Sequence, residues 1–208
     1  MIYNWVAQPI KAVIAIVLMF SLVGCGPVKR NIENEYQLSS YSHKKYESYP
    51  SKSTLLVVKP QAVGGYQTSE MLYIKKPYEL MSFAYNAWVD PPANMLFPLL
   101  LQSLNSANYF HAIDSTPYAK ETTYRLDTLL LSLHQNFLTK PSTVQMSIKA
   151  VLSRSNDNQV IDSIIIKTQK PCPEDTPYGG VIAANEAVKT VTGAVTDFVI
   201  KRVKSQRG

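Results

Sequence analysis

The chain has 208 residues, a formal net charge of +6 at pH 7, 13 prolines and two cysteines. This length suits a single domain with its own hydrophobic core, and two cysteines are too few for the disulfide framework on which small secreted scaffolds depend. The basic excess is modest, and part of it is clustered between Lys201 and Arg207, where cations complement the negative end of a helix dipole.

The first predicted element is an export signal. Residues 12–24 are apolar apart from Ser21 and have basic residues on both sides, as export signals do. The run is too short to span a bilayer, which needs about 20 apolar residues. It ends in Leu22-Val23-Gly24-Cys25, which resembles a bacterial lipobox and implies that residues 1–24 are a lipoprotein signal peptide cleaved between Gly24 and Cys25. The alternatives are an uncleaved anchoring helix and an ordinary signal beside a coincidental cysteine.

The lipobox resemblance implies a covalent lipid on Cys25, with a diacylglycerol thioether on the sulfur and an acyl chain such as palmitate on the amine. Each buried methylene contributes about 0.8 kcal/mol, so two or three long chains make release from a membrane negligible. Gly26 follows the cysteine, and lipoproteins without an aspartate there resemble those sent to the outer membrane. We therefore expect a protein anchored in the outer membrane and facing the periplasm, where nucleic acid is not an expected partner.

Two regions are predicted after the signal. Residues 25–53 are polar and rich in serine, tyrosine and lysine, which predicts a lipid-anchored polar linker, and residues 54–208 are predicted to form the periplasmic domain. Residues 55–58 and 71–75 predict its first strands. Residues 80–89 predict a further strand with large side chains on both faces, which indicates that both faces are covered.

Asp90-Pro91-Pro92 predicts the start of a helix that extends to about Ala107. The Asp90 carboxylate is expected to cap free amide groups, and proline suits the first helical position. Pro98 lies inside this helix and predicts a local bend. The helix carries one apolar stripe at helical spacing, made of Leu96, Leu99, Leu100, Ser103, Leu104 and Ala107.

The remaining elements complete the predicted fold class. Residues 109–113 predict a short strand, and residues 124–137, 144–152 and 160–169 predict three longer ones. The short polar connections between the longer strands favour an antiparallel meander. The spacing of alanine and valine predicts a last helix over residues 181–203. These elements indicate a single compact α/β or α+β domain, with a mixed, mostly antiparallel sheet packed against two main helices.

Several motifs carry a resemblance to a known family. They are Leu80-Met-Ser-Phe-Ala-Tyr-Asn-Ala-Trp-Val-Asp-Pro-Pro92, Met95-Leu96, Tyr109-Phe110, Val57-Val58-Lys59-Pro60, Tyr73, Tyr124-Arg125-Leu126 and the alanine-rich C-terminal helix. Behind a lipobox, they resemble the ABC-type transport auxiliary lipoprotein family, which includes the paraquat-inducible intermembrane transport lipoproteins. The resemblance covers most of the mature chain. It implies a compact α/β domain that accompanies transporters using MCE-domain proteins to carry phospholipids across the periplasm, and it transfers no catalytic residue.

The chain lacks the residue patterns of common catalytic and metal sites. His43, His111 and His134 lie far apart and never at the spacing of a helical metal pair. His134 with Asp127 or Asp114 could form part of a dyad, but no recognisable nucleophile motif or glycine-rich phosphate loop accompanies it. We therefore expect no enzymatic activity, no metal and no cofactor other than the covalent lipid.

Aromatic side chains are the candidate partner contacts. Tyr78, Tyr85 and Trp88 are amphipathic groups of the kind that anchor interfaces, and for Trp88 a core position is the alternative. Cys172 lies between two prolines. Because the lipid occupies the other cysteine, we expect Cys172 to be a small buried side chain, with intermolecular pairing as the alternative.

The preferred functional hypothesis is an adaptor. A lipid-anchored domain would dock an MCE-domain protein and its ABC permease complex at the outer membrane, and a homo-oligomer would suit docking to a tube. The first alternative is a periplasmic module that carries a phospholipid in its own apolar groove. The second is an unrelated outer-membrane assembly or pilot lipoprotein.

Overall fold

The computed structural model describes residues 31–46, 51–115 and 122–206, so the predicted signal peptide and Cys25 lie outside the described residues. Residues from Ile32 onward form one compact unit. Its elements are, in chain order, β1 (Asn34–Tyr36), β2 (Ser51–Val57), β3 (Gln61–Ala62), the 3-10 turn η1 (Gly64–Tyr66), β4 (Glu70–Lys76), β5 (Glu79–Trp88), α2 (Pro92–Ser106), β6 (Phe110–Asp114), β7 (Tyr124–Asn136), β8 (Thr143–Arg154), β9 (Val160–Pro171) and α3 (Pro177–Ser205). The predicted mixed α/β class is confirmed.

Strand β7 organises the sheet because both of its edges are paired. One edge pairs antiparallel with β8, from Tyr124 opposite Arg154 to Asn136 opposite Thr143, and β8 pairs antiparallel with β9. This is the predicted meander. Along the other edge, β2, β3 and β4 follow one another, all parallel to β7. β6 extends the sheet beyond β2, and β5 and then β1 extend it beyond β4.

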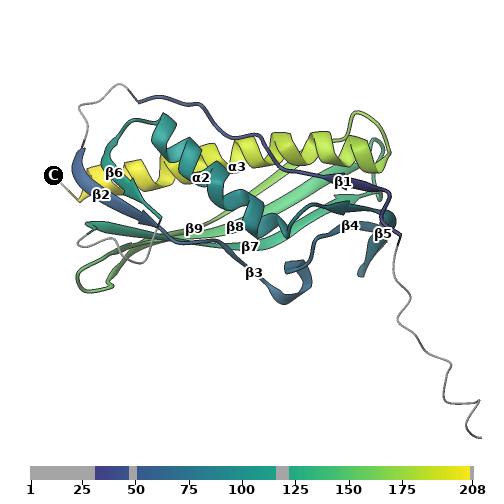
Figure 1. Ribbon diagram of the computed structural model, residues 1–208, viewed down its shortest axis with the longest axis horizontal. Coiled ribbons are helices and arrows are strands. Elements are labelled where there is room, and N and C mark those ends of the chain that lie inside the picture. The colour runs from purple at the N-terminus through teal and green to yellow at the C-terminus, as the bar shows by residue number, and fades with distance from the viewer. Residues whose placement is uncertain (1–30, 47–50, 116–121, 207–208) are drawn as a thin grey trace, which may run out of the picture. The chain divides into compact units, whose positions relative to one another are not determined.

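The core lies between this sheet and the two helices, which pack on one of its faces (Figure 1). The predicted stripe of α2 is buried, with Leu96, Leu100 and Leu104 fully enclosed. The inward side chains of β8 alternate as predicted, and Ile148 and Leu152 are also fully enclosed. Burying one such side chain stabilises a fold by about 1.5–3 kcal/mol.

The start of α2 differs from the prediction in one respect. Pro92 is the first helical residue, as expected, but the predicted cap by Asp90 is wrong: no side chain caps the helix, and Asp90 Oδ1 instead accepts a hydrogen bond from Asn94 Nδ2 at 2.9 Å. The helix continues through Pro98, which lies on its exposed side.

The prediction that β5 is covered on both faces is wrong. Leu80, Met81 and Tyr85 are 42%, 40% and 56% exposed, and only Ala87 and Trp88 at the end of the strand are buried. The physical reason is position. β5 lies near the margin of the sheet, where β1 pairs with its last three residues, and α3 packs over β8 and β9 instead.

Candidate functional site

The three predicted contact residues fall in two different environments. Tyr78 forms the turn between β4 and β5, with a left-handed φ of 66° and a fully exposed side chain. Tyr85 is exposed on β5. Trp88 is 5% exposed and belongs to the core, so its prediction as a partner contact is wrong and the core alternative is correct. Trp88 lies in the part of β5 that is paired with β1, and it lines a small interior cavity together with Gly180 and Ala184 of α3.

The turn that carries Tyr78 lies at the same end of the sheet as the connection between β7 and β8. Because β4 runs parallel to β7, with Ile74 opposite Asn136, the two strands reach this end together. We call it the hairpin end, defined as residues 75–81 and 137–142. It presents four large exposed apolar or aromatic side chains, Tyr78, Leu80, Met81 and Leu138.

An aromatic cluster holds the two parts of the hairpin end together. The ring centroids of Tyr73 and Phe83 are 4.4 Å apart, and Phe137 lies edge-on to both, at 6.0 and 6.3 Å. Lys75 Nζ lies 5.2 Å from the centre of the Tyr73 ring and 5.5 Å from that of Phe137. Aromatic and cation–π contacts of this kind stabilise by about 0.5–1.5 kcal/mol each. They hold the strands on both sides of the Tyr78 turn in place.

The interpretation of residues 25–53 as a polar linker is wrong for residues 31–46, which we call the N-terminal strap. The strap begins as a strand: β1 lies parallel to the end of β5, with Asn34 opposite Asn86, and Glu33 N–H donates to the Tyr85 carbonyl at 3.0 Å. It then runs along α3 and past α2 (Figure 1). Leu38 is 5% exposed in the core, and its amide lies 3.4 Å from Met95 Sδ.

The side-chain amide of Asn185 in α3 forms hydrogen bonds with backbone groups of the strap, as a neighbouring strand would. Its Oδ1 accepts hydrogen bonds from the amides of Ser39 and Ser40 at 2.8 and 3.1 Å, and its Nδ2 donates to the carbonyl of Gln37 at 3.3 Å. The same Nδ2 donates to the Val181 carbonyl one turn earlier in α3 at 3.1 Å. One side chain therefore satisfies three backbone groups of the strap, which an extended segment off the sheet would otherwise expose to water.

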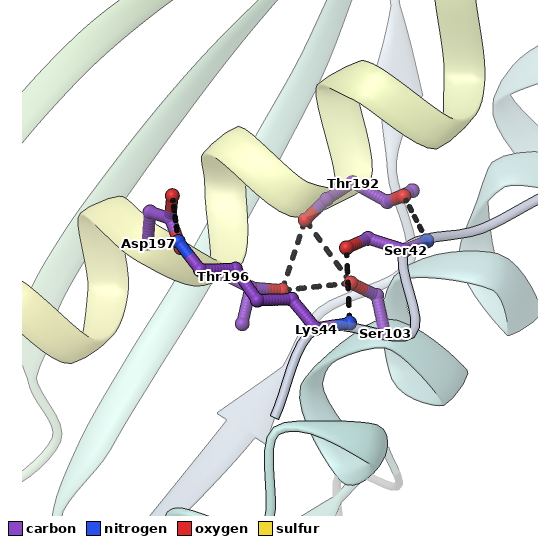
Figure 2. Close-up of polar contacts among 6 residues, drawn as sticks. All are labelled: Ser42, Lys44, Ser103, Thr192, Thr196 and Asp197. Atoms are coloured by element: carbon purple, nitrogen blue, oxygen red, sulfur yellow. Dashed lines mark hydrogen bonds and ion pairs between the residues drawn. The ribbon is translucent and has the colours of Figure 1, made fainter. Parts of the chain in front are cut away.

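A second contact forms where the strap, α2 and α3 meet (Figure 2). Ser42 N–H donates to Thr192 Oγ1 at 3.0 Å. Behind it, Ser103 Oγ of α2 lies 2.9 Å from Thr196 Oγ1 and donates to the Thr192 carbonyl at 3.2 Å, and all three of these residues are buried. Thr192 is therefore contacted by the strap through its hydroxyl and by α2 through its carbonyl.

Gly193 lets the strap approach α3 closely. A Cβ at this position would lie 3.0 Å from Ser42 Oγ and 3.1 Å from Ser42 Cβ, tighter than ordinary van der Waals contact. Further along, Lys44 Nζ forms an ion pair with both carboxylate oxygens of Asp197 at 2.9 Å. The strap reaches Tyr46, whose amide donates to the carbonyl of Ala107 at the end of α2 at 3.3 Å.

An open hollow lies at the junction of the strap and α3. It has a volume of about 560 Å³, and its rim carries exposed Val89, Tyr178 and Ile182 beside Tyr36. The rings of Tyr36 and Tyr178 are 6.0 Å apart. This hollow holds a second group of exposed apolar side chains, separate from the hairpin end, and sequence reasoning did not single out any of its residues.

Cys172 is buried and free, as the preferred interpretation expected. Gln135 Nε2 donates toward its sulfur at 3.5 Å and toward Ser142 Oγ at 2.9 Å, and the Ser142 amide donates to Asp175 at 2.6 Å. Burial raises the pKa of the Cys172 thiol. A buried thiol with a raised pKa is a poor nucleophile. We therefore assign the cluster a structural role, in which its hydrogen bonds fix the segment before α3.

The structure does not assemble the dyad considered from sequence. His134 Nδ1 lies 3.0 Å from the hydroxyl of Tyr66, and burial lowers the pKa of His134. Asp127 forms an ion pair with Arg125 at 2.8 Å. Within residues 31–46, 51–115 and 122–206, no group of three or more histidine, cysteine or acidic side chains could hold a metal ion. No helix within the same ranges is long and apolar enough to cross a membrane.

Comparison with known proteins places the fold. No family model matches the chain, and no curated protein matches its sequence. Among solved structures, the fold is similar to that of a Xanthomonas campestris protein of the DUF330 family, with 16% identity over 83% of this chain and 98% of that chain and a TM-score of 0.74. It is also similar to an uncharacterised protein, with 14% identity over 81% of this chain and 99% of that chain and a TM-score of 0.66.

Proposed function

We propose that the protein is a lipid-anchored adaptor without catalytic activity, which docks an MCE-domain protein and its ABC permease at the outer membrane. The observation that carries the proposal is the docked strap. Because the strap holds residues from Glu33 to Tyr46 on the body, only eight residue steps separate a lipid on Cys25 from the first fixed residue. A protein held this closely at a membrane suits a docking role better than a ferrying role.

The motifs that carry the family resemblance also have structural roles in the fold, which supports the resemblance. The segment from Leu80 to Pro92 forms β5 and the first residue of α2, which join the hairpin end to the core. The short motifs around Val57 and Leu126 lie opposite each other in the paired strands β2 and β7. Motifs far apart in sequence therefore build one continuous part of the fold.

The interior argues against the lipid-carrier alternative. The cavity between β4, β5, β7 and α3 has a volume of about 10 Å³, room for about one water molecule, whereas pockets for drug-sized ligands occupy about 300–1,000 Å³. Two wider hollows lie open to solvent: the hollow of about 560 Å³ between the strap and α3, and one of about 640 Å³ on the outer face of the meander, lined by Leu131, Ile165 and Lys167 among others. A phospholipid seated there would co-purify, and mass spectrometry of organic extracts detects it. An adaptor should yield no stoichiometric phospholipid.

The anchor is tested by exchanging each cysteine in turn. In cells fed labelled palmitate, the wild-type chain and Cys172→Ala should incorporate label and fractionate with membranes. Cys25→Ala should do neither. Cys172→Ala is the matched control because it removes the other thiol, which is buried. Labelling of the Cys25→Ala chain would contradict the anchor.

The partner is tested by affinity capture of the anchored protein. We expect an MCE subunit and its permease to co-purify after cross-linking. We assign the partner contact to the open hollow at the junction of the strap and α3, whose rim carries Tyr178. Tyr178 is 57% exposed, and Tyr178→Ser should reduce capture without changing membrane fractionation. Val160→Ser is the control, because Val160 is 59% exposed at the start of β9. Capture of no MCE subunit by the wild-type protein would contradict the proposed partner.

A further inference from the structure

We propose that the hairpin end rests on the membrane that holds the anchor, with Tyr78 at the level of the phospholipid headgroups. This inference rests on the proposed lipid at Cys25 and adds a second, non-covalent contact with the bilayer. Three observations carry it: the length of chain before the strap, the direction in which the strap runs, and the chemistry of the side chains at the hairpin end.

The chain between anchor and body is short. Cys25 and Glu33 are eight residue steps apart, and eight extended residues span at most about 27 Å. A linker extending to residue 53 would have reached about 95 Å, enough for the body to sit away from the membrane in any orientation. With the strap docked, the point at which β1 joins β5 must lie within about 27 Å of the headgroup surface.

The direction of β1 selects the end that faces the membrane. β1 runs parallel to β5, so Asn34, its first residue, is the residue of β1 nearest to the start of β5, which belongs to the hairpin end. Glu33 lies level with Tyr85, bonded to its carbonyl. β5 is bulged between Ala87 and Glu79, and the segment of β4 opposite, from Glu70 to Lys76, covers only about 20 Å. The reach of the anchoring segment is therefore long enough for the tip of the hairpin to lie at the membrane surface.

The side chains of the hairpin end suit a bilayer interface. Tyr78 is fully exposed at the tip, and Leu80, Met81 and Leu138 are 40% to 48% exposed beside it. Tyrosine is enriched at headgroup level because its ring is apolar and its hydroxyl is polar.

Basic side chains lie close to this apolar group. Lys75 and Lys76 precede the turn, with Glu79 on the other side. The Lys75 amine lies over the Tyr73 and Phe137 rings, whereas an exposed lysine such as Lys76 extends its amine toward phosphate while its stem covers apolar surface. Lys140 lies in the neighbouring connection and Lys170 at the end of β9, near acidic Glu174 and Asp175. Because these charges nearly balance, the apolar tip is the main contribution to membrane contact.

The test places a fluorescent label on the full-length lipidated protein in vesicles of phosphatidylethanolamine and phosphatidylglycerol. Tyr78→Cys supplies the labelled thiol, because Cys172 is buried and Cys25 carries lipid. Asn156→Cys is the matched control, since Asn156 is exposed in the β8–β9 turn at the opposite end of the sheet. Leu138→Cys is a second hairpin-end site, should the first variant fail to fold. A phospholipid with a quencher on its acyl chain reports proximity to the bilayer.

We expect quenching at positions 78 and 138 to exceed that at position 156 several-fold, with a blue shift of the label at position 78. Equal quenching at the two ends of a lipidated protein would overturn the inference and leave the anchor intact. A label at position 78 that is shielded from aqueous iodide but unquenched by lipid would also overturn it, by assigning the hairpin end to another protein chain. An unmodified Cys25 thiol, read from the mass of the intact protein, would overturn the anchor and the inference together.

Discussion

The N-terminal strap and the hairpin end are built in opposite ways from what their compositions suggest. The strap is polar, yet it is held along its length on the sheet and the two helices. The hairpin end is rich in large apolar side chains, yet four of them are exposed. The difference teaches that hydropathy does not decide which segment is covered. Backbone hydrogen bonds and the single buried side chain of Leu38 fix the strap, and position at the margin of the sheet exposes the hairpin end.

The largest expected effect compares two leucines, one in each region. Leu38→Ala should destabilise the protein by about 3 kcal/mol, because it empties a buried site between the strap and α2. Leu80→Ala, at a site 42% exposed, should change the free energy of unfolding by less than about 0.5 kcal/mol. Urea unfolding of both variants checks the pair. Equal losses would break the distinction between a fixed strap and an open hairpin.

The next largest effect concerns the hydrogen bonds between Asn185 and the strap. Asn185→Ala removes the acceptor for two strap amides and the donor to the Gln37 carbonyl, and should cost about 2 kcal/mol. Glu186→Ala, on the exposed side of the same helix turn, should cost no more than about 0.5 kcal/mol. Limited proteolysis should cut the Asn185→Ala chain within residues 37–46 faster than the Glu186→Ala chain. Identical cleavage rates would show that Asn185 does not hold the strap.

A smaller effect tests the close approach at Gly193. Replacing an interior helical glycine by alanine ordinarily stabilises by about 1 kcal/mol, but here the new methyl group would crowd Ser42. Gly193→Ala should therefore stabilise little in the wild-type chain and by about 1 kcal/mol in a Ser42→Gly background. Equal gains in the two backgrounds, measured by thermal unfolding, would mean that Ser42 is not packed on α3.

The smallest effect concerns the ion pair at the far part of the strap. The side chains of Lys44 and Asp197 are 54% and 46% exposed, and pairs this open contribute about 0–1 kcal/mol and less at high salt. Asp197→Asn should cost no more than about 0.5 kcal/mol, and the loss should vanish in molar salt. A larger, salt-independent loss would move the main attachment of the strap from Asn185 to this pair.

The sequence predicts well those elements whose side chains alternate regularly. The meander was predictable because β7, β8 and β9 are long and their connections short, and the stripe of α2 was predictable from its leucines. The strap was not, because its own side chains have little periodicity beyond Tyr36 to Leu38. Its partners do leave a trace in α3: a glycine at position 193, inside a helix, lowers helix stability and marks a close approach.

The candidate site was predictable only in part, for a related reason. Tyr78 follows Pro77 and was predicted as a partner contact, and it is fully exposed. Tyr85 and Trp88 both lie on β5, and Trp88 is buried because it belongs to the part of the strand that pairs with β1 and lies near Gly180 and Ala184 of α3. Burial at these positions is decided by packing between elements that are distant in sequence, so the pattern of a single strand cannot predict it.

The central claim is that the strap is docked, which shortens the tether to the membrane. Hydrogen exchange of the full-length protein tests it most directly, by following the amides of Ser39, Ser40 and Ser42. The account predicts that these amides exchange far more slowly than an unstructured peptide of the same sequence, because Asn185 and Thr192 accept their hydrogen bonds. Exchange of residues 37–46 at the unstructured rate would contradict it.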